Sequence, residues 1–272
     1  MTLENDPLNP LTKDLRDAAS TLTAGQARFM VDLYYQWQED RKSAHGQIRA
    51  AAEEPEPHDV VVWLADNTSK VENNIKNALG VYANSQVVGR WAQSIVGIGP
   101  VISAGLLAHI DITKAPTVGH IWSFAGVNPE QKWEKKTKRP FNAKLKVLVW
   151  KIGESFVKVC NNDNDVYGHI YKERKDLEEE RNEAGQFADQ AERILSEKNI
   201  GKTTEAYKAY IEGKLPPAHI HARAKRYAAK LFLAHYHHVA YESEYSTPPP
   251  KPYVIDHLKH AHYITPPNWP LD

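Results

Sequence analysis

The chain has 272 residues, 42% of them hydrophobic and 25% charged, which is the balance of a globular protein large enough to bury a sizeable core. It lacks an apolar run of about 18 residues and an N-terminal signal pattern, so we expect neither a membrane span nor secretion. The 34 basic and 34 acidic residues cancel, which argues against a uniformly basic nucleic-acid binder and directs attention to local charge.

The N-terminal third is predicted to form a flexible arm, residues 1–22, and a helical coiled-coil hairpin, residues 23–90. Thr23 and Gln26 have the spacing of a capping box, and the prolines of "EEPEPHD" end the helix that this box begins. A second helix is expected from about Val60 to Val88. The apolar stripes of the two helices would contain Phe29, Met30, Leu33, Tyr34, Trp37, Trp63, Val71, Ile75, Leu79 and Tyr82. Such a hairpin serves either as a scaffold or as an arm for dimerisation or for reaching a partner.

The rest of the chain is also predicted to be helical, which makes the fold class all-α. Residues 91–245 would form a helical domain with a compact unit up to residue 160, a long polar helix at 167–195, and a last helix after Pro216–Pro217. Residues 246–272 form an extended proline-rich tail, which we expect to wrap over the surface.

The most specific local pattern is the pair of glycines on either side of Ile98. In "SIVGIGPVISAGLLAHI" one helix would end at 95–96, Gly97 and Gly99 would make a tight turn with access to positive φ, and Pro100 would begin the next helix. Ile98 would turn into the core, and outward-facing backbone N–H groups would contact phosphate, as in a helix–hairpin–helix element. The alternative is an ordinary capping turn within a helical bundle.

A basic segment follows this turn and surrounds a tryptophan with cations. Between residues 132 and 158 there are nine Lys or Arg and two acids, and the stretch between Pro129 and Pro140 lacks helical periodicity. Cations that follow phosphates, beside a ring that stacks on bases, are typical of single-stranded nucleic-acid binding. The candidate residues are Lys132, Trp133, Lys135, Lys136, Lys138, Arg139 and, on the next helix, Lys144. The alternative is a solvated loop with incidental lysines.

The last helix carries Arg223, Arg226 and Lys230 at spacings of three and four, which places them on one face. This face is either a second phosphate-binding stripe or the wet side of an amphipathic helix.

Eight of the thirteen histidines lie between residues 219 and 262. The pairs at 219/221 and 235/237 do not have the spacing that brings two imidazoles to one side of a helix, and acidic co-ligands are few. We therefore expect no metal and no other cofactor, and we assign these histidines to stacking, hydrogen bonding to RNA or core packing.

The sequence offers no catalytic centre. It contains no P-loop, no His-Glu-x-x-His motif and no nucleophile elbow, and its acids are spread around a helix instead of converging as two-metal hydrolysis requires. The single cysteine, Cys160, indicates a reducing compartment, so we expect a cytoplasmic protein.

The block "VGIGPVISAGLLAHIDITKAPTVGHIWSFAGVNP", residues 96–129, with the basic segment and "NAKLKVLVWKI" after it, resembles the C-terminal domain of bridge-RNA-guided insertion-sequence transposases. The late stretch "AHIHARAKRYAAKLFLAHYHHVAYE" is similar to the closing helix of that domain. A helical hairpin before such a block also resembles the coiled coil and Nop domain of box C/D ribonucleoprotein cores. The Tas proteins of TIGR systems, which are RNA-guided DNA-targeting factors, share both likenesses.

The resemblance to Tas proteins implies a Nop-like helical domain, a guide RNA and a target DNA as partners, a homodimer formed by the hairpin, no membrane partner, and a prokaryotic or phage origin. Two departures from the transposases shape the expected function. We expect no acidic nuclease domain, because only a short arm precedes the hairpin, and no serine lies between Phe124 and Glu154, where those transposases place a nucleophile. The resemblance thus implies RNA-guided DNA targeting without a nuclease domain of its own, and we expect no enzyme activity.

Two alternatives stay open. A DNA-binding protein derived from a transposase or recombinase would act in transposition, with Thr137 as its candidate hydroxyl or with a nuclease supplied by a partner. A helical scaffold would instead use the basic segment to contact acidic proteins.

Overall fold

The computed structural model describes residues 11–51, 58–131, 133–134, 136–250 and 264–271, and these residues form helices and connecting turns without a strand. The all-α fold class is therefore confirmed. In chain order the α-helices are α1 (Lys13–Ala18), α2 (Ala24–Ala50), α3 (Asp59–Asn84), α4 (Val87–Ser94), α5 (Pro100–His109), α6 (Val118–Phe124), α7 (Ala143–Val159), α8 (Tyr167–Glu183), α9 (Ala188–Glu197), α10 (Glu205–Ile211) and α11 (Pro217–Tyr245). Short 3-10 helices are η1 (Ala19–Thr21) and η3 (Ile112–Lys114). None of the described helices has both the length and the apolar character that crossing a bilayer requires.

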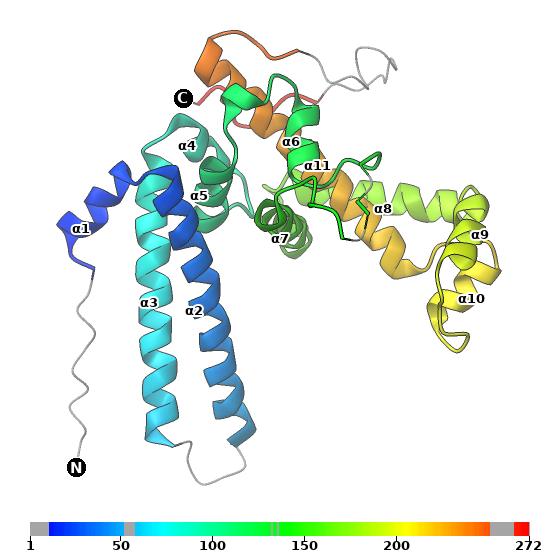
Figure 1. Cartoon of the computed structure of the whole chain (residues 1–272), viewed down its shortest axis with the longest axis horizontal. Helices are drawn as coiled ribbons and strands as arrows, with labels where there is room; N and C mark the ends of the chain where they lie inside the picture. Colours follow the sequence, from blue (N-terminus) through cyan, green and yellow to red (C-terminus); the bar gives the residue numbers. More distant parts are fainter. Residues whose placement is uncertain (1–10, 52–57, 132, 135, 251–263, 272) are drawn as a thin grey trace.

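Helices α2 and α3 form the predicted hairpin, which extends away from the rest of the molecule (Figure 1). The capping box is present: the hydroxyl of Thr23 accepts from the N–H of Gln26, and the Gln26 side chain accepts from the N–H of Thr23. Eight of the ten residues predicted for the apolar stripes pack in one cluster, whereas Phe29 and Trp63 are exposed and the small residue Ala27 is fully buried. Small side chains at this position let the helix backbones approach closely.

Two boundaries in this region differ from the prediction. Part of the expected flexible arm is helical, because the Thr12 side chain caps the start of α1. The second long helix ends at Asn84 instead of continuing to Val88, and α4 then packs back across its end. Gly89 makes this possible, since a Cβ at that position would lie 2.0 Å from the carbonyl oxygen of Ala83.

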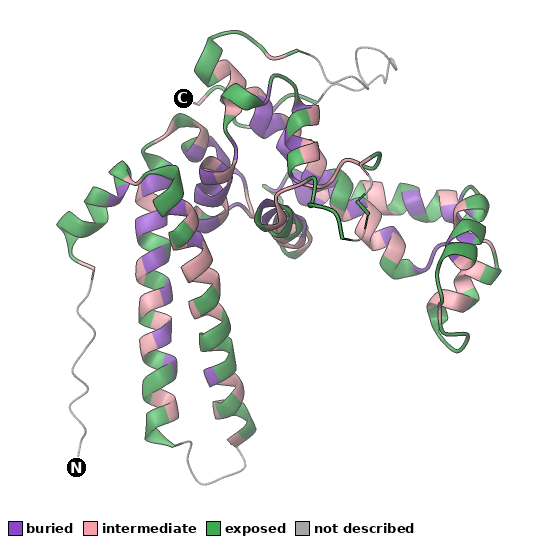
Figure 2. Cartoon of the chain, in the orientation of Figure 1, coloured by how far each residue is buried: buried purple, intermediate pink, exposed green. Residues whose placement is uncertain are grey.

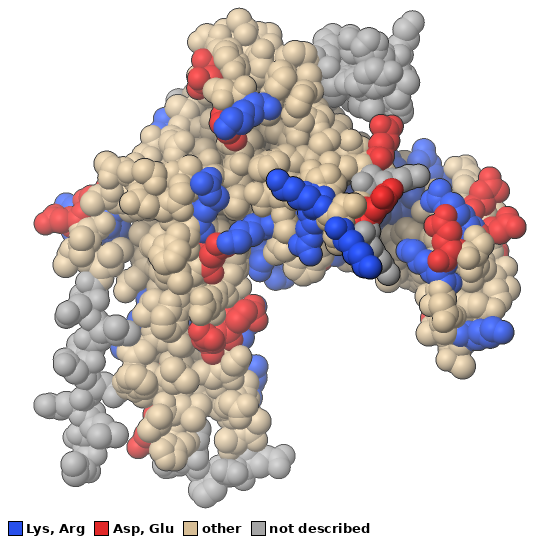
Figure 3. Space-filling model, in the orientation of Figure 1, with Lys and Arg blue, Asp and Glu red and all other residues tan. Residues whose placement is uncertain are grey.

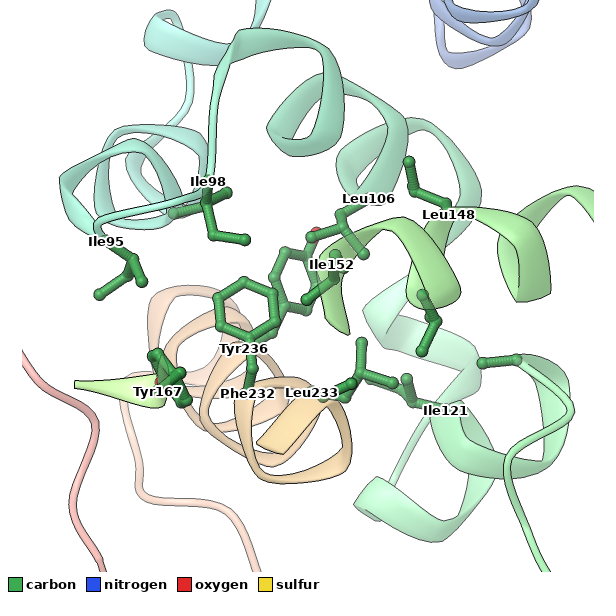
Figure 4. Packing of buried hydrophobic residues seen from close by; sticks show 14 of the residues in the cluster. Ile95, Ile98, Leu106, Ile121, Leu148, Ile152, Tyr167, Phe232, Leu233 and Tyr236 are labelled. Atoms are coloured by element: carbon green, nitrogen blue, oxygen red, sulfur yellow. The ribbon is translucent and has the colours of Figure 1, made fainter. Parts of the chain in front are cut away.

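The main core lies where α4, α5, α6, α7 and α11 meet, whereas much of the far end of the hairpin is exposed (Figure 2). Trp91 is fully buried and stacks on Phe232 with a ring-centre distance of 5.7 Å. Figure 4 shows Ile98 in the same cluster as Phe232 and Tyr236. Apolar packing therefore joins the glycine turn to the last helix, although the two are far apart in the sequence.

The long polar helix predicted for 167–195 is divided into two. Gly185 adopts φ +73° after the end of α8, and α9 then turns so that its Ile194 packs in a separate cluster with Leu215. Helix α8 is not purely solvent-facing either, because Glu178 is buried where α8 packs on α11. Helices α8, α9 and α10 form an arm that projects on the other side of the core from the hairpin (Figure 1).

The described end of the tail, residues 264–271, lies against the core. The indole N–H of Trp91 donates to the carbonyl of Pro267 at 2.8 Å. The indole N–H of Trp269 donates to the carboxylate of Glu242 at 2.8 Å. These contacts attach the end of the chain to both α4 and α11.

Candidate nucleic-acid interface

The turn between α4 and α5 has the predicted shape, with one difference. Gly97 adopts φ +93°, the N–H of Ile98 donates to the carbonyl of Ile95 at 2.9 Å, and the Ile98 side chain is buried. Pro100 is the first residue of α5, as predicted. Gly99, in contrast, has φ −90°, so the expectation of positive φ at both glycines is wrong. A residue that continues directly into a helix N-terminus needs extended backbone, which any amino acid adopts.

Gly97 lacks a side chain because the protein's own helix α7 lies against it. A Cβ here would be 3.1 Å from Cγ2 of Val159 and 3.3 Å from Oγ of Ser155, whose hydroxyl donates to the carbonyl of Gly97. Gly99 has different surroundings, since it is exposed and a Cβ there would meet nothing within 4 Å. Gly97 therefore serves packing, and Gly99 is the glycine that a ligand can approach.

The first turn of α5 presents backbone donors. Pro100 has no N–H, and the first bond of the helix runs from the N–H of Ser103 to the carbonyl of Gly99 at 3.0 Å. Gly99 supplies no side-chain cap, and among the described residues no backbone acceptor meets the N–H groups of Val101 and Ile102. Together with the helix dipole, these groups make the start of α5 electropositive.

The described residues of the basic segment at 133–134 and 136–139 form a compact turn, which we call the basic turn. The indole N–H of Trp133 donates to the carbonyl of Thr137 at 3.0 Å, and the Thr137 hydroxyl donates to the carbonyl of Glu134 at 2.7 Å. The guanidinium of Arg139 lies 5.4 Å from the centre of the Trp133 ring, which is still 45% exposed. The exposed cations of this turn are Lys136, Lys138 and Arg139. Their side chains are therefore presented to solvent around a tryptophan whose orientation the turn holds.

Three further lysines belong to the predicted set, namely Lys132, Lys135 and Lys144. Lys132 and Lys135 lie outside the described residues. Lys144, near the start of α7, pairs with Asp32 of α2 and so connects α7 to the hairpin. Both partners are exposed, so water and salt weaken the pair, and Lys144 can exchange Asp32 for a phosphate at little cost.

The predicted stripe on α11 is divided by its internal contacts. Arg223 donates to the buried carboxylate of Glu178 at 2.6 Å and to the side chain of Gln190 at 3.1 Å, so its charge is already neutralised. The ammonium of Lys230 lies 4.3 Å from the centre of the Trp122 ring. Arg226 is exposed. The structure therefore does not offer these three cations as one continuous phosphate-binding row.

A cleft of about 390 Å³ lies between the hairpin, the start of α5 and α7. Four lysines line it, namely Lys42 from α2, Lys76 from α3, and Lys151 and Lys158 from α7. Glu154 also lines the cleft, but its carboxylate pairs with Lys225 of α11. Lys151 and Lys158 belong to the basic stretch 132–158 seen in the sequence, but Lys42 and Lys76 were missed, because the spacing along one helix carries no signal about lysines on its neighbours.

On the face drawn in Figure 3, several basic side chains lie near the middle of the molecule. Figure 3 shows Lys and Arg along the edge of a wide recess between the hairpin and the arm of α8 to α10. The net charge of zero thus conceals a basic region on this face.

The described histidines of α11 make hydrogen bonds inside the protein. Nε2 of His235 donates to the carbonyl of Ile264 at 2.8 Å, because a carbonyl can only accept, and Nδ1 then accepts from the hydroxyl of Tyr167 at 2.7 Å. Burial lowers the pKa of His235 to about 4, so the ring is neutral near pH 7. His237 likewise contacts the carbonyl of Ala115 at 2.8 Å. Within the described ranges, no three His, Cys, Asp or Glu residues are grouped as a metal site requires.

Comparison with known proteins identifies a relationship for one part of the chain. A family model described as the transposase IS116/IS110/IS902 family matches residues 90–153. No curated protein and no solved structure matches the chain. The matched residues include the glycine turn, α5, α6, the basic turn and the first part of α7. Residues 90–153 of this protein are therefore similar to the IS116/IS110/IS902 transposases.

Proposed function

We propose that this protein binds a guide RNA and positions a DNA target that pairs with it, acting by binding and not by cleavage. The observation that carries the proposal is the exposed set of cations around the half-exposed Trp133, inside a transposase-related segment. Base pairing between guide and target would supply the sequence specificity, while the protein recognises the backbone. Target DNA, guide RNA and a homodimeric assembly are all part of this proposal.

The basic turn suits single-stranded RNA. Lys136, Lys138 and Arg139 are exposed and close together in sequence, which supports contacts to successive phosphates. Arg139 lies beside the ring of Trp133, and a base that stacks on this ring would contribute about 1–3 kcal/mol. The bond from the Trp133 indole to Thr137 holds the ring in place before RNA arrives, which reduces the entropy lost on binding.

The first test is the identity of nucleic acid that co-purifies with the protein, followed by RNA affinity as a function of salt. The logarithm of the binding constant should fall with the logarithm of salt concentration by roughly 0.7 per phosphate contact. The double variant Lys138→Gln/Arg139→Gln should reduce that slope by roughly 1.4, since two contacts are lost. The control is Lys70→Gln/Lys202→Gln, which removes the same charge from exposed sites on α3 and near α10.

A second pair of variants isolates stacking. Trp133→Phe and Trp133→Leu both lose the indole bond to Thr137, but only the first keeps a ring. We expect Phe to bind RNA more tightly than Leu by about 1 kcal/mol or more. Protein that carries no RNA and shows no salt-dependent RNA affinity would overturn the proposal.

The family match favours a second candidate function, a DNA-binding role in transposition. In this case a hydroxyl such as that of Thr137 would lose its proton and attack a DNA phosphodiester, which forms a threonyl phosphodiester while the phosphorus–oxygen bond to one sugar breaks and that sugar oxygen leaves as a hydroxyl after taking up a proton. The Thr137 hydroxyl already donates to the carbonyl of Glu134 within its own turn. A protein–DNA adduct on a suicide substrate that disappears in Thr137→Ala would support this candidate over the first.

A further inference from the structure

The four cleft lysines, Lys42, Lys76, Lys151 and Lys158, have little counter-charge. Lys42 pairs with Glu39 at 2.8 Å, and the ammonium of Lys151 lies 3.8 Å from the centre of the Tyr35 ring. Lys76 and Lys158 form no ion pair with the residues that the structure describes. The cleft is thus more positive than its surroundings, with two of its cations unneutralised.

Three of these lysines also repel one another, namely Lys42, Lys151 and Lys158. Partial burial lowers the pKa of Lys151, and the ammonium groups of Lys42 and Lys158 lower it further, although Glu39 opposes them. Like charges that a fold holds together raise its free energy until an anion joins them. An anion in the cleft would contact several lysines and remove this repulsion.

The start of α5 forms one wall of the cleft, from Gly99 to Ile102. Gly99 has no side chain to obstruct a ligand, and the N–H groups of Val101 and Ile102 are among the donors of this first turn. Backbone donors at a helix N-terminus complement phosphate well. Here they face a space that lysines from three helices also line, so the wall and the lysines act on the same ligand.

The volume of the cleft and the tryptophan in its lining indicate which chemical group binds together with the phosphate. A volume of about 390 Å³ lies at the small end of the range for ligand sites, which suits one nucleotide unit and excludes a duplex. Trp150 lines the cleft and is 59% exposed, so its ring is available to a base or a ribose. The cleft therefore has both a phosphate-binding wall and an aromatic surface.

We propose that this cleft is a second nucleic-acid contact, separate from the basic turn, which holds one backbone phosphate of single-stranded RNA together with its nucleotide. The proposal rests on the proposed function, because it assigns an additional position on the same RNA. RNA in the cleft would contact α2, α3, α5 and α7 at once, and so would join the hairpin to the segment that is similar to transposases.

Gly99 allows a matched test. Gly99→Asp and Gly99→Asn both supply a side chain that caps α5, and the open space at this position accepts either. The two variants should unfold at similar denaturant concentrations, but only Asp adds a negative charge where the phosphate would lie. With a fluorescently labelled uridine homopolymer as probe, Asp should bind about tenfold more weakly than Asn.

Variants of the cleft lysines provide a second test, in which the salt dependence of binding is measured. Lys76→Gln and Lys158→Gln should each reduce the salt slope for this probe by roughly 0.7, whereas Lys70→Gln, on the same helix as Lys76 but away from the cleft, should not. The cleft proposal fails, while the proposed function stands, if wild-type protein binds the probe but the two Gly99 variants bind it equally well and both cleft lysine variants keep the wild-type salt slope. If wild-type protein shows no salt-dependent binding, both fail. A deoxyribose version of the probe tests the sugar: tighter binding of DNA than of RNA would overturn the assignment to RNA.

Discussion

Gly97 and Gly99 are two positions apart, yet each has its own physical reason to be glycine. Gly97 combines φ +93° with a close contact to Val159 of α7. Gly99 has ordinary backbone angles and open space beside it. Substitution at the first should therefore act on stability, and substitution at the second on binding.

Gly97→Ala is expected to lower the free energy of unfolding by roughly 1–3 kcal/mol, because alanine is strained at positive φ and its Cβ would press on Val159. Gly99→Ala should change it by less than about 0.5 kcal/mol. Urea unfolding of the two variants checks both values. Equal destabilisation would contradict the assignment of Gly97 to packing and Gly99 to an open surface.

His235 shows how a histidine in a histidine-rich helix can be part of the core. Its neutral ring satisfies a donor and an acceptor at once, with Tyr167 on one side and Ile264 on the other. Protonation of Nδ1 would turn that acceptor into a donor and place a charge in a buried site. The fold therefore depends on the neutral form.

The stability of the protein should consequently depend on pH. The folded pKa of His235 is about 4, below the value of about 6.5 expected for an unfolded chain, so the unfolded state binds the extra proton between these values. The stabilisation from neutral His235 is complete above about pH 6.5 and is lost as the pH falls toward 4, by roughly 3 kcal/mol. Unfolding free energies of wild type and His235→Gln should be measured from pH 7 to pH 4. Glutamine does not titrate, so the variant should lose less stability, and parallel curves would contradict the role of His235.

At the scale of helices, an ion-paired cluster contributes to the packing of α8 on α11. Glu178 of α8 is 1% exposed and accepts from Arg223 of α11 and from Arg174 of its own helix. Burial alone would raise the pKa of Glu178, but the hydrogen bonds from the two arginines outweigh burial and lower it. The cluster explains why Arg223 is committed to the fold and is not a free phosphate contact.

Glu178→Gln should destabilise the protein by roughly 3 kcal/mol, because it leaves two partly buried arginines without their counter-charge. The adjacent Glu179 is a matched control. It pairs with Lys175 at 3.3 Å in an exposed position, so Glu179→Gln should cost about 0.5 kcal/mol or less. Thermal or urea unfolding distinguishes the two, and similar losses would show that the cluster does not stabilise the packing.

At the scale of the whole molecule, two arms extend from one core and leave a recess with basic side chains at its edge (Figure 3). The hairpin is tied to the core by the pair of Lys144 with Asp32 and by the contact of Lys151 with Tyr35. An RNA that contacts both the basic turn and the cleft would reach α7 from two sides.

The homodimer stays a prediction, and the hairpin offers a place to test it. Val60, Trp63 and Leu64 are exposed near the start of α3. If they contact a second copy, Trp63→Glu/Leu64→Glu should convert a dimer to a monomer in light scattering, because charged groups at a protein interface are costly to desolvate. Tyr245→Glu changes an equally exposed ring on α11 and should leave the mass unchanged. A wild-type monomer at working concentrations would contradict the prediction.

Sequence patterns that span only a few residues were sufficient to predict much of the fold and part of the candidate site. The capping box at Thr23, the turn that ends at Pro100 and the helix that begins at Pro217 all depend on interactions within a few residues, so the sequence by itself determined them. The break at Gly185 was missed because a helical pattern continues on both sides of it.

Only the tertiary structure decided which cations remain available to a ligand. In the sequence, Arg223 and Arg226 are equivalent positions on one face of the last helix, yet in the fold Glu178 of another helix neutralises Arg223. Lys42 and Lys76 carry no pattern of their own, yet the fold brings them to one cleft with the lysines of α7. The physical reason is range: backbone sterics and caps act between neighbours in sequence, whereas charge pairing and cleft formation join side chains that only the packed core brings together.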